Sequence, residues 1–164
     1  MTALAYRPAT EPDARFILGS WLASYRNAHQ AGLISRERWN DVMGIELRDV
    51  LLRPGCVTRI AYNPGAADPG LDAYGWIAGE PSRREPLVHY CYVKHPYRRM
   101  GIARGLLAAL GIDPRREFHY TCRTKVVSQL PIPMGRHRPL IARGIADDES
   151  AAPTREEIRH GQRK

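Results

Sequence analysis

Residues 93–103 read Val-Lys-His-Pro-Tyr-Arg-Arg-Met-Gly-Ile-Ala, and they join two segments of different character. The run before them, residues 87–93, is apolar without clean alternation, as expected of a strand buried on both faces. In the run after them, apolar residues recur at helical spacing before Gly111, namely Ile102, Leu106, Leu107 and Leu110. The sequence therefore predicts a central strand, a basic loop and a helix that ends at Gly111.

The loop has the chemistry of a phosphate-binding site. The unpaired N–H groups of a first helical turn and the helix dipole both favour an anion, and Gly101 lets that anion approach the backbone. Arg98, Arg99 and Arg104 supply countercharge. The segment lacks the Gly-Lys-Ser/Thr ending of a P-loop and the three-glycine spacing of a dinucleotide site. It therefore predicts an anion-binding loop of another kind.

The flanking sequence predicts a mixed α/β architecture. We expect a strand over residues 3–6 before Pro8, a helix over 13–28, and a helix over 36–52 with Ser35 as its N-cap. Two strands over 56–62 and 72–77 follow, and Gly79-Glu80-Pro81 closes the second as a turn. After the helix at 102–110 we expect a fifth strand over 118–122. Residues 124–130 allow two helical turns at most, and 139–145 allow one more strand.

Composition narrows the class of protein. The chain has 164 residues, of which 43% are hydrophobic and 26% charged, as in one ordinary globular domain rather than a disordered or fibrous chain. Its three cysteines, Cys56, Cys91 and Cys122, predict neither a disulfide framework nor a zinc ribbon, and the six histidines show no metal-ligand spacing. No apolar run is long enough to span a bilayer and no signal-peptide core is visible, so we expect a cytoplasmic protein without metal.

The net charge of +8 is confined to the middle of the chain. Residues 1–52 are neutral, residues 53–145 carry +9, and residues 146–164 carry −1. An anionic partner would therefore dock on the middle segment, although a solvated arginine-rich surface explains the surplus equally well. The basic region 115–143 leaves nucleic-acid binding open as an alternative function.

Residues 93–103 resemble the acyl-CoA signature of the GNAT superfamily of N-acyltransferases, Arg/Gln-x-x-Gly-x-Gly/Ala. Arg98, Gly101 and Ala103 occupy its positions, Val93 precedes it by five residues, and Arg99 stands where glycine is common. The predicted order of elements over residues 3–123 is similar to that of the same fold. The resemblance implies a mixed, mostly antiparallel sheet with helices on both faces and a splay between strands four and five. We expect one domain over 1–145 and a polar tail over 146–164.

The resemblance also implies a donor substrate and a reaction. Acetyl-CoA would lie in the splay, and an amine would attack its thioester directly, without a covalent acyl-enzyme. Backbone groups of Tyr92 and Val93 would bind the pantetheine. The pyrophosphate would be held by the remaining residues of the loop and first turn, namely Arg98, Arg99, Met100, Gly101, Ile102, Ala103 and Arg104.

Three side chains are candidates for the proton transfers of such a reaction. His89 could act as general base, Glu80 could act as base through water, and Tyr120 could protonate the leaving thiolate. Each also has an ordinary structural interpretation: a hydrogen-bonded strand histidine, a solvated turn and a packed aromatic ring. Many GNAT enzymes carry a tyrosine acid in a helix after the fifth strand. This chain has no tyrosine beyond Tyr120, and its C-terminal part is short.

Other interpretations remain open at this level. A GNAT scaffold can serve phage-type nucleic-acid modification, and a non-catalytic member could bind CoA without turnover. Cys91 and Cys122 could face each other across the splay, although small buried hydrophobic side chains are the simpler interpretation. The sequence leaves the amine acceptor unidentified and is compatible with a homodimer.

Overall fold

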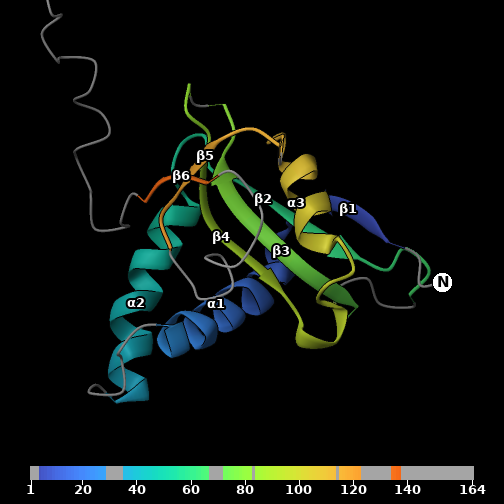
Figure 1. Cartoon of the computed structure of the whole chain (residues 1–164). Coiled ribbons are helices and arrows are strands. Elements are labelled where there is room, and N and C mark those ends of the chain that lie inside the picture. The colour runs from blue at the N-terminus through green and yellow to red at the C-terminus, as the bar shows by residue number, and fades with distance from the viewer. Residues whose placement is uncertain are drawn as a thin grey trace, which may run out of the picture.

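The computed structural model describes residues 4–28, 35–66, 72–82, 84–113, 115–122 and 134–137. These residues form one six-stranded sheet with the strands in chain order, three α-helices and two short 3-10 helices (Figure 1). The elements are β1 (Ala5–Pro8), η1 (Glu11–Asp13), α1 (Ala14–Ala28), α2 (Arg36–Leu51), β2 (Val57–Tyr62), β3 (Ala73–Glu80), β4 (Leu87–Val93), η3 (His95–Tyr97), α3 (Ile102–Leu110), β5 (Phe118–Tyr120) and β6 (Met134–His137).

The sheet is mixed, as predicted. Neighbours from β1 to β4 pair antiparallel, whereas β4 with β5 and β5 with β6 pair parallel. A parallel neighbour needs a crossover connection, and α3 supplies it between β4 and β5. Among the described helices, none is long and apolar enough to cross a membrane.

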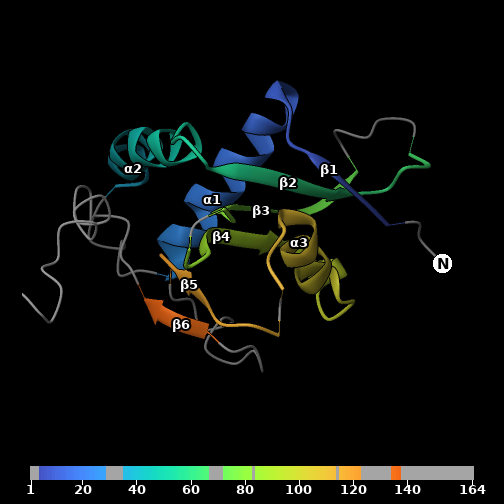
Figure 2. The same cartoon turned by 90° about the horizontal axis from the view of Figure 1, so that it is seen from above.

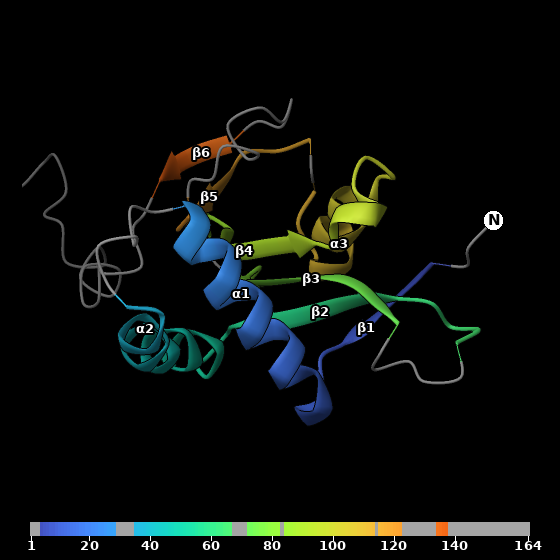
Figure 3. The same cartoon turned by 90° about the horizontal axis from the view of Figure 1, so that it is seen from below.

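Helices cover both faces of the sheet. Figures 2 and 3 show α1 and α2 on one side and α3 on the other. Each side has its own hydrophobic core: the first is built around Trp21, Leu47 and Trp76, and the second around Ile77 and Leu106. The predicted helices and the central strand agree closely with the observed bounds. For the helices, the reason is that capping residues define their ends. The Ser35 side chain accepts a hydrogen bond from the Arg38 N–H, and Gly111 ends α3 in a left-handed conformation.

Three predicted strands differ from the structure by two or more residues at an end, and the fifth is Phe118–Tyr120 rather than residues 118–122. The first strand is Ala5–Pro8 rather than residues 3–6, because an edge strand tolerates a proline at its end. The strand expected over 72–77 extends from Ala73 to Glu80 and is buried along its whole length. Glu80 therefore belongs to β3, and its interpretation as part of a solvated turn is wrong.

The C-terminal prediction is tested only in part. The structure has a strand, β6, over Met134–His137, where none was expected, because Gly135 and the neighbouring prolines gave no strand signal. The helical turns expected over 124–130, the strand over 139–145 and the tail over 146–164 lie outside the described residues.

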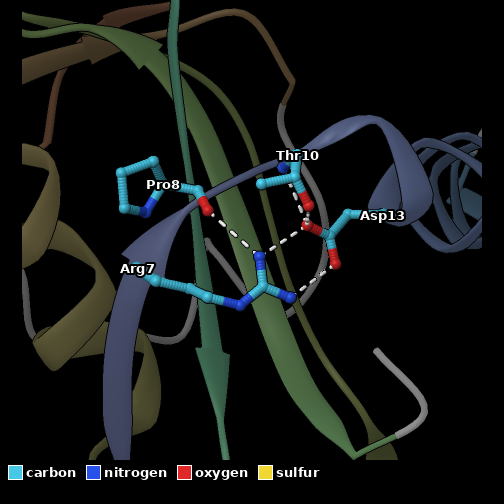
Figure 4. Close-up of polar contacts among 4 residues, drawn as sticks. All are labelled: Arg7, Pro8, Thr10 and Asp13. Atoms are coloured by element: carbon cyan, nitrogen blue, oxygen red, sulfur yellow. Dashed lines mark hydrogen bonds and ion pairs between the residues drawn. The ribbon is translucent and has the colours of Figure 1, made fainter. Parts of the chain in front are cut away.

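An ion pair between Arg7 and the buried Asp13 fixes the junction between β1 and α1 (Figure 4). The Arg7 guanidinium donates to both carboxylate oxygens of Asp13, at 2.6 and 2.8 Å. The same carboxylate accepts from the backbone N–H and the hydroxyl of Thr10, both at 2.8 Å. Asp13 is only 2% exposed, so these four bonds compensate the burial of its charge.

Hydroxyl groups of α1 attach that helix to the sheet. The Trp76 indole donates to the Ser20 hydroxyl at 2.8 Å, and the Tyr90 hydroxyl donates to the Ser24 hydroxyl at 2.9 Å. Ser20 and Ser24 are one turn apart and therefore face the sheet together. These bonds place α1 directly over β3 and β4.

On the opposite face, Gly105 lets α3 approach β1. A β-carbon built at Gly105 would overlap the ring and the hydroxyl of Tyr6. Close packing on the sheet thus explains a glycine inside a helix, where it normally costs about 1 kcal/mol relative to alanine.

Candidate active site

A bulge interrupts β4 at His89. Ala78 lies opposite Tyr90, whereas the next residue, Gly79, lies opposite Val88, so His89 has no partner of its own in β3. Gly79 permits this close approach, because a β-carbon there would lie 2.5 Å from the Leu87 carbonyl oxygen. A bulge redirects a side chain and changes which backbone groups face each edge of the strand.

The edge of β4 beyond the bulge is open toward β5. In the described part of the chain, β5 pairs with β4 only at Leu87 and Val88. The last contacts come from Thr121, whose N–H donates to the Val88 carbonyl at 3.0 Å and whose hydroxyl donates to the His89 carbonyl at 2.9 Å. Among the described residues, the second half of β4 therefore has no partner on the β5 side, which is the geometry of a splay.

Val93 rather than Tyr92 directs its backbone toward that open edge. The Lys94 N–H donates to the Tyr74 carbonyl in β3 at 2.8 Å, and backbone groups of successive residues point to opposite edges of a strand. The N–H of Val93 therefore points away from β3, whereas the backbone of Tyr92 faces β3 opposite Trp76. The Val93 carbonyl already accepts a bond from Arg98 Nε at 3.1 Å. Of the two residues predicted to bind the pantetheine, Val93 is therefore the one with its N–H on the open edge.

The loop from β4 to α3 has the backbone of an anion site. Arg99 has a φ of 65°, uncommon for a residue with a side chain, and Gly101, the N-cap of α3, has a φ of 79°. The first intrahelical bond runs from the Gly105 N–H to the Gly101 carbonyl. The N–H groups of Ile102, Ala103 and Arg104 therefore have no partner within the helix, and Gly101 has no side chain to cap them. These groups can bind an anion.

Positive side chains surround this helix end. Arg98, Arg99 and Arg104 are exposed here, whereas Lys94 Nζ lies over the Phe16 ring of α1 at 5.0 Å, on the other face of the sheet. Met100 is 60% exposed, whereas Ile102 is 3% exposed and packs in the core below α3. Ile102 can thus contribute only its backbone to a ligand. All seven predicted pyrophosphate residues lie together at the start of α3.

The structure brings two of the candidate catalytic residues into contact. His89 Nε2 lies 2.9 Å from Glu80 Oε1, and the residues are 1% and 7% exposed. The sequence presents them only as two separate candidates. The β3–β4 hairpin and its bulge place them together, and no local pattern in the sequence encodes that register.

The Glu80 carboxylate sets the chemistry of the imidazole. An ionised carboxylate only accepts hydrogen bonds, so this contact suits an imidazole with its proton on Nε2. His89 Nδ1 is buried and has no hydrogen-bond partner among the described residues. The same carboxylate also affects Cys56. Burial, as the larger cause, and the negative charge of Glu80 raise the pKa of the Cys56 thiol to about 11.

Tyr120 lies on the neighbouring strand. It is half-buried in β5 and opposite Val88, the residue before His89. The third candidate thus lies on the strand next to the bulge.

The two cysteines of the region pack on opposite faces of the sheet. Cys122 belongs to the core below α1 and α2, whereas Cys91 packs against the core below α3. The idea that they face each other across the splay is therefore wrong. Burial raises the pKa of each thiol to about 12, so neither is ionised near neutral pH.

Little of the alternative nucleic-acid surface falls on described residues. Arg115 and Arg116 are exposed, but most of region 115–143, including Arg123, Lys125, Arg138 and Arg143, lies outside the described residues. Within the described part of the chain, no group of three or more His, Cys, Asp or Glu residues could hold a metal ion.

No protein-family model matches this sequence, and no curated protein does either. The structure is nevertheless similar to several solved structures. A proposed acetyl transferase from Pyrococcus furiosus matches with a TM-score of 0.55 and 12% identity, over 93% of this chain and 95% of that one.

Two further solved structures are similar over a smaller part. One is a proposed GNAT-family acetyltransferase from Desulfovibrio desulfuricans, at TM-score 0.41 and 19% identity over 66% of this chain. This chain spans 63% of that protein's length. The other is the aminoglycoside N-acetyltransferase AAC(6')-Iy in complex with CoA, at TM-score 0.41 and 14% identity over 68% of each chain. The chain has a GNAT-like fold, as its motif and element order predicted.

Proposed function

We propose that this chain is an N-acetyltransferase that transfers an acetyl group directly from acetyl-CoA to an amine. The observation that carries the proposal is the open edge of β4, which runs from the bulge at His89 to the anion-binding start of α3. Such an edge offers hydrogen bonds to an extended pantetheine chain, and the helix start offers them to a pyrophosphate. The GNAT-like fold is consistent with this arrangement.

In the proposed complex, the N–H groups of residues 99–104 and the side chains of Arg98, Arg99 and Arg104 hold the pyrophosphate, because the Arg98 N–H already donates to the His95 carbonyl. The Val93 N–H binds the pantetheine. Arg98 also holds the end of β4 in place, because its Nε donates a hydrogen bond to the Val93 carbonyl. This assignment directs the thioester along β4 toward the bulge.

His89 is the proposed general base and Glu80 the residue that positions it. The amine nitrogen attacks the thioester carbonyl, a C–N bond forms and the C–S bond breaks. His89 Nδ1 takes the proton that the amine loses, because the hydrogen bond to Glu80 occupies Nε2. Tyr120 is the proposed donor of a proton to the departing thiolate. With Nδ1 buried, the proton reaches His89 from the bound amine or through one water.

The first experiment measures binding. Acetyl-CoA at about 100 times its dissociation constant should stabilise the protein by about 2.7 kcal/mol in thermal unfolding. The double variant Arg98→Ala/Gly101→Asp should lose this gain, because it removes a positive charge and places a negative one at the helix start. Arg36→Ala, an exposed arginine of α2, is the matched control and should keep the gain. Absence of stabilisation by any common acyl-CoA would contradict the proposal.

The second experiment measures turnover. Release of free thiol from acetyl-CoA is followed across a panel of small amines, polyamines and peptides with a free N-terminus. An amine-dependent rate supports the transferase. Acetyl-CoA binding without thiol release from any amine would instead favour the non-catalytic alternative.

A further inference from the structure

The outer side of α2 carries an exposed apolar stripe. Val42 and Ile45 of α2 and the C-cap residue Leu52, which keeps a helical conformation, are 49%, 61% and 81% exposed. They are three and seven residues apart, so they lie on one side of the helix. Figures 1 and 2 show α2 at the periphery of the molecule, with this helix remote from α3. Exposed apolar side chains that gather on one side of a helix can form an interaction surface.

A groove borders the stripe between α1 and α2. Its volume is about 480 Å³, and Leu18, Leu22, Asn40, Asp41, Gly44, Ile45 and Arg48 line it. Gly44 leaves it open, because a β-carbon built there meets no other atom within 4 Å. The groove is thus apolar on the α1 side and has room for a side chain.

The charges along the stripe are arranged symmetrically about Ile45. Asp41 precedes it by four residues and Arg48 follows it by three, and both are exposed. Because they are two helical turns apart, they lie on the same flank of α2. If a second α2 packs antiparallel with the two-fold axis at Ile45, Asp41 faces the partner's Arg48. The symmetry repeats this contact, since Arg48 then faces the partner's Asp41.

We propose that α2 is the interface of a homodimer in which the two copies of this helix pack antiparallel about Ile45. The two isoleucines meet on the axis, and the partner's Arg48 enters the groove beside Asp41, with its aliphatic stem over Gly44. The self-complementary order of charges favours a second copy of this chain over an unrelated partner, which would have no need for it. This inference is independent of the proposed acetyltransferase activity.

The size of the surface predicts how strongly the copies associate. One helix pair and one groove give an interface near the lower end of specific contacts, so the dimer should dissociate on dilution. Sedimentation velocity over a concentration series is therefore the appropriate measurement. The mass should rise from the 18.5 kDa of the monomer toward twice that value.

Charge reversal tests the geometry. Asp41→Arg and Arg48→Asp should each weaken association by about tenfold or more, because each places like charges together. The double variant Asp41→Arg/Arg48→Asp should restore it, because the ion pairs reform with their signs exchanged. Ile45→Arg should abolish it. Arg36→Glu, on the same helix but off the stripe, should leave it unchanged, and circular dichroism checks that every variant is folded.

Three results would overturn the proposal. The first is a monomer at every concentration up to about 1 mM. The second is a dimer that survives Ile45→Arg, since the copies would then meet through another surface. The third is a double variant that associates no better than either single variant.

Discussion

His89 Nε2 lies 2.9 Å from Glu80 Oε1, and the pair is buried at the bulge of β4, next to the point where the pairing of β4 with β5 ends. This contact separates two roles that either residue could fill alone. A histidine held by a carboxylate can act as base through its other nitrogen, whereas a carboxylate that already accepts the imidazole proton is a weaker candidate.

Substitution at the pair distinguishes the base from the residue that positions it. His89→Gln should lower kcat by about 10²–10⁴-fold, because general-base catalysis contributes that much. Glu80→Gln retains an acceptor for the imidazole N–H and should cost far less. Equal losses in the two variants would instead make Glu80 the base.

Tyr120 is tested by removing only its hydroxyl. Tyr120→Phe should lower kcat by about 10²-fold if the hydroxyl protonates the thiolate, and it should leave acetyl-CoA binding unchanged. Tyr97→Phe, in η3, provides the comparison and should not change kcat. An unchanged kcat in Tyr120→Phe would mean that the Tyr120 ring serves only in packing.

The contribution of the β1–α1 junction to the stability of the fold should depend on pH. Burial raises the pKa of the Asp13 carboxyl, but hydrogen bonds from Arg7 and Thr10 and the Arg7 charge outweigh it, so the pKa falls below its usual 3.8. The carboxylate therefore stabilises the fold above the unfolded pKa, and this contribution is lost as pH falls through the folded pKa.

Asp13→Asn should cost about 1–3 kcal/mol in urea unfolding at pH 7, and less at pH 3, where the wild-type carboxyl is closer to protonation. Glu11→Gln, an exposed neighbour in η1, is the control and should change little at either pH. An equal cost at both pH values would mean that the charge contributes nothing.

Replacing two helical glycines with alanine should change the free energy of unfolding in opposite directions. Gly105→Ala should destabilise the protein by about 1–3 kcal/mol, because the new methyl overlaps Tyr6 and the strain exceeds the gain in helix propensity. Gly44→Ala meets no atom within 4 Å and should stabilise it by up to about 1 kcal/mol. In a double-mutant cycle, Tyr6→Leu should reduce the cost of Gly105→Ala.

The cysteines should be unreactive in the folded protein. With pKa values raised by burial to about 11 for Cys56 and about 12 for Cys91 and Cys122, about 0.1% or less of each thiol is ionised at pH 8. Labelling with a disulfide reagent should be slow in buffer and fast in denaturant. Rapid labelling of one native thiol would reveal a reactive cysteine.

Local signals determined most of the secondary structure. Ser35 and Gly111 define helix ends through their own capping geometry. The run at 87–93 is apolar enough to indicate a central strand whatever its tertiary contacts. The loop at 94–101 was likewise readable, since the chemistry of a helix start needs only glycine, arginine and free N–H groups. These features depend on residues within a few positions of one another.

The sequence by itself thus determined the element order, the GNAT-like strand–loop–helix and the place where the positive charge gathers. Only the tertiary structure decided that Glu80 is buried in β3 against His89, that Cys91 and Cys122 lie in different cores, and that β6 forms at Met134–His137. The physical reason is register: one extra residue in a strand changes the face and edge of every residue beyond it. The bulge at His89 comes from packing between β3 and β4, which no local pattern of residues encodes.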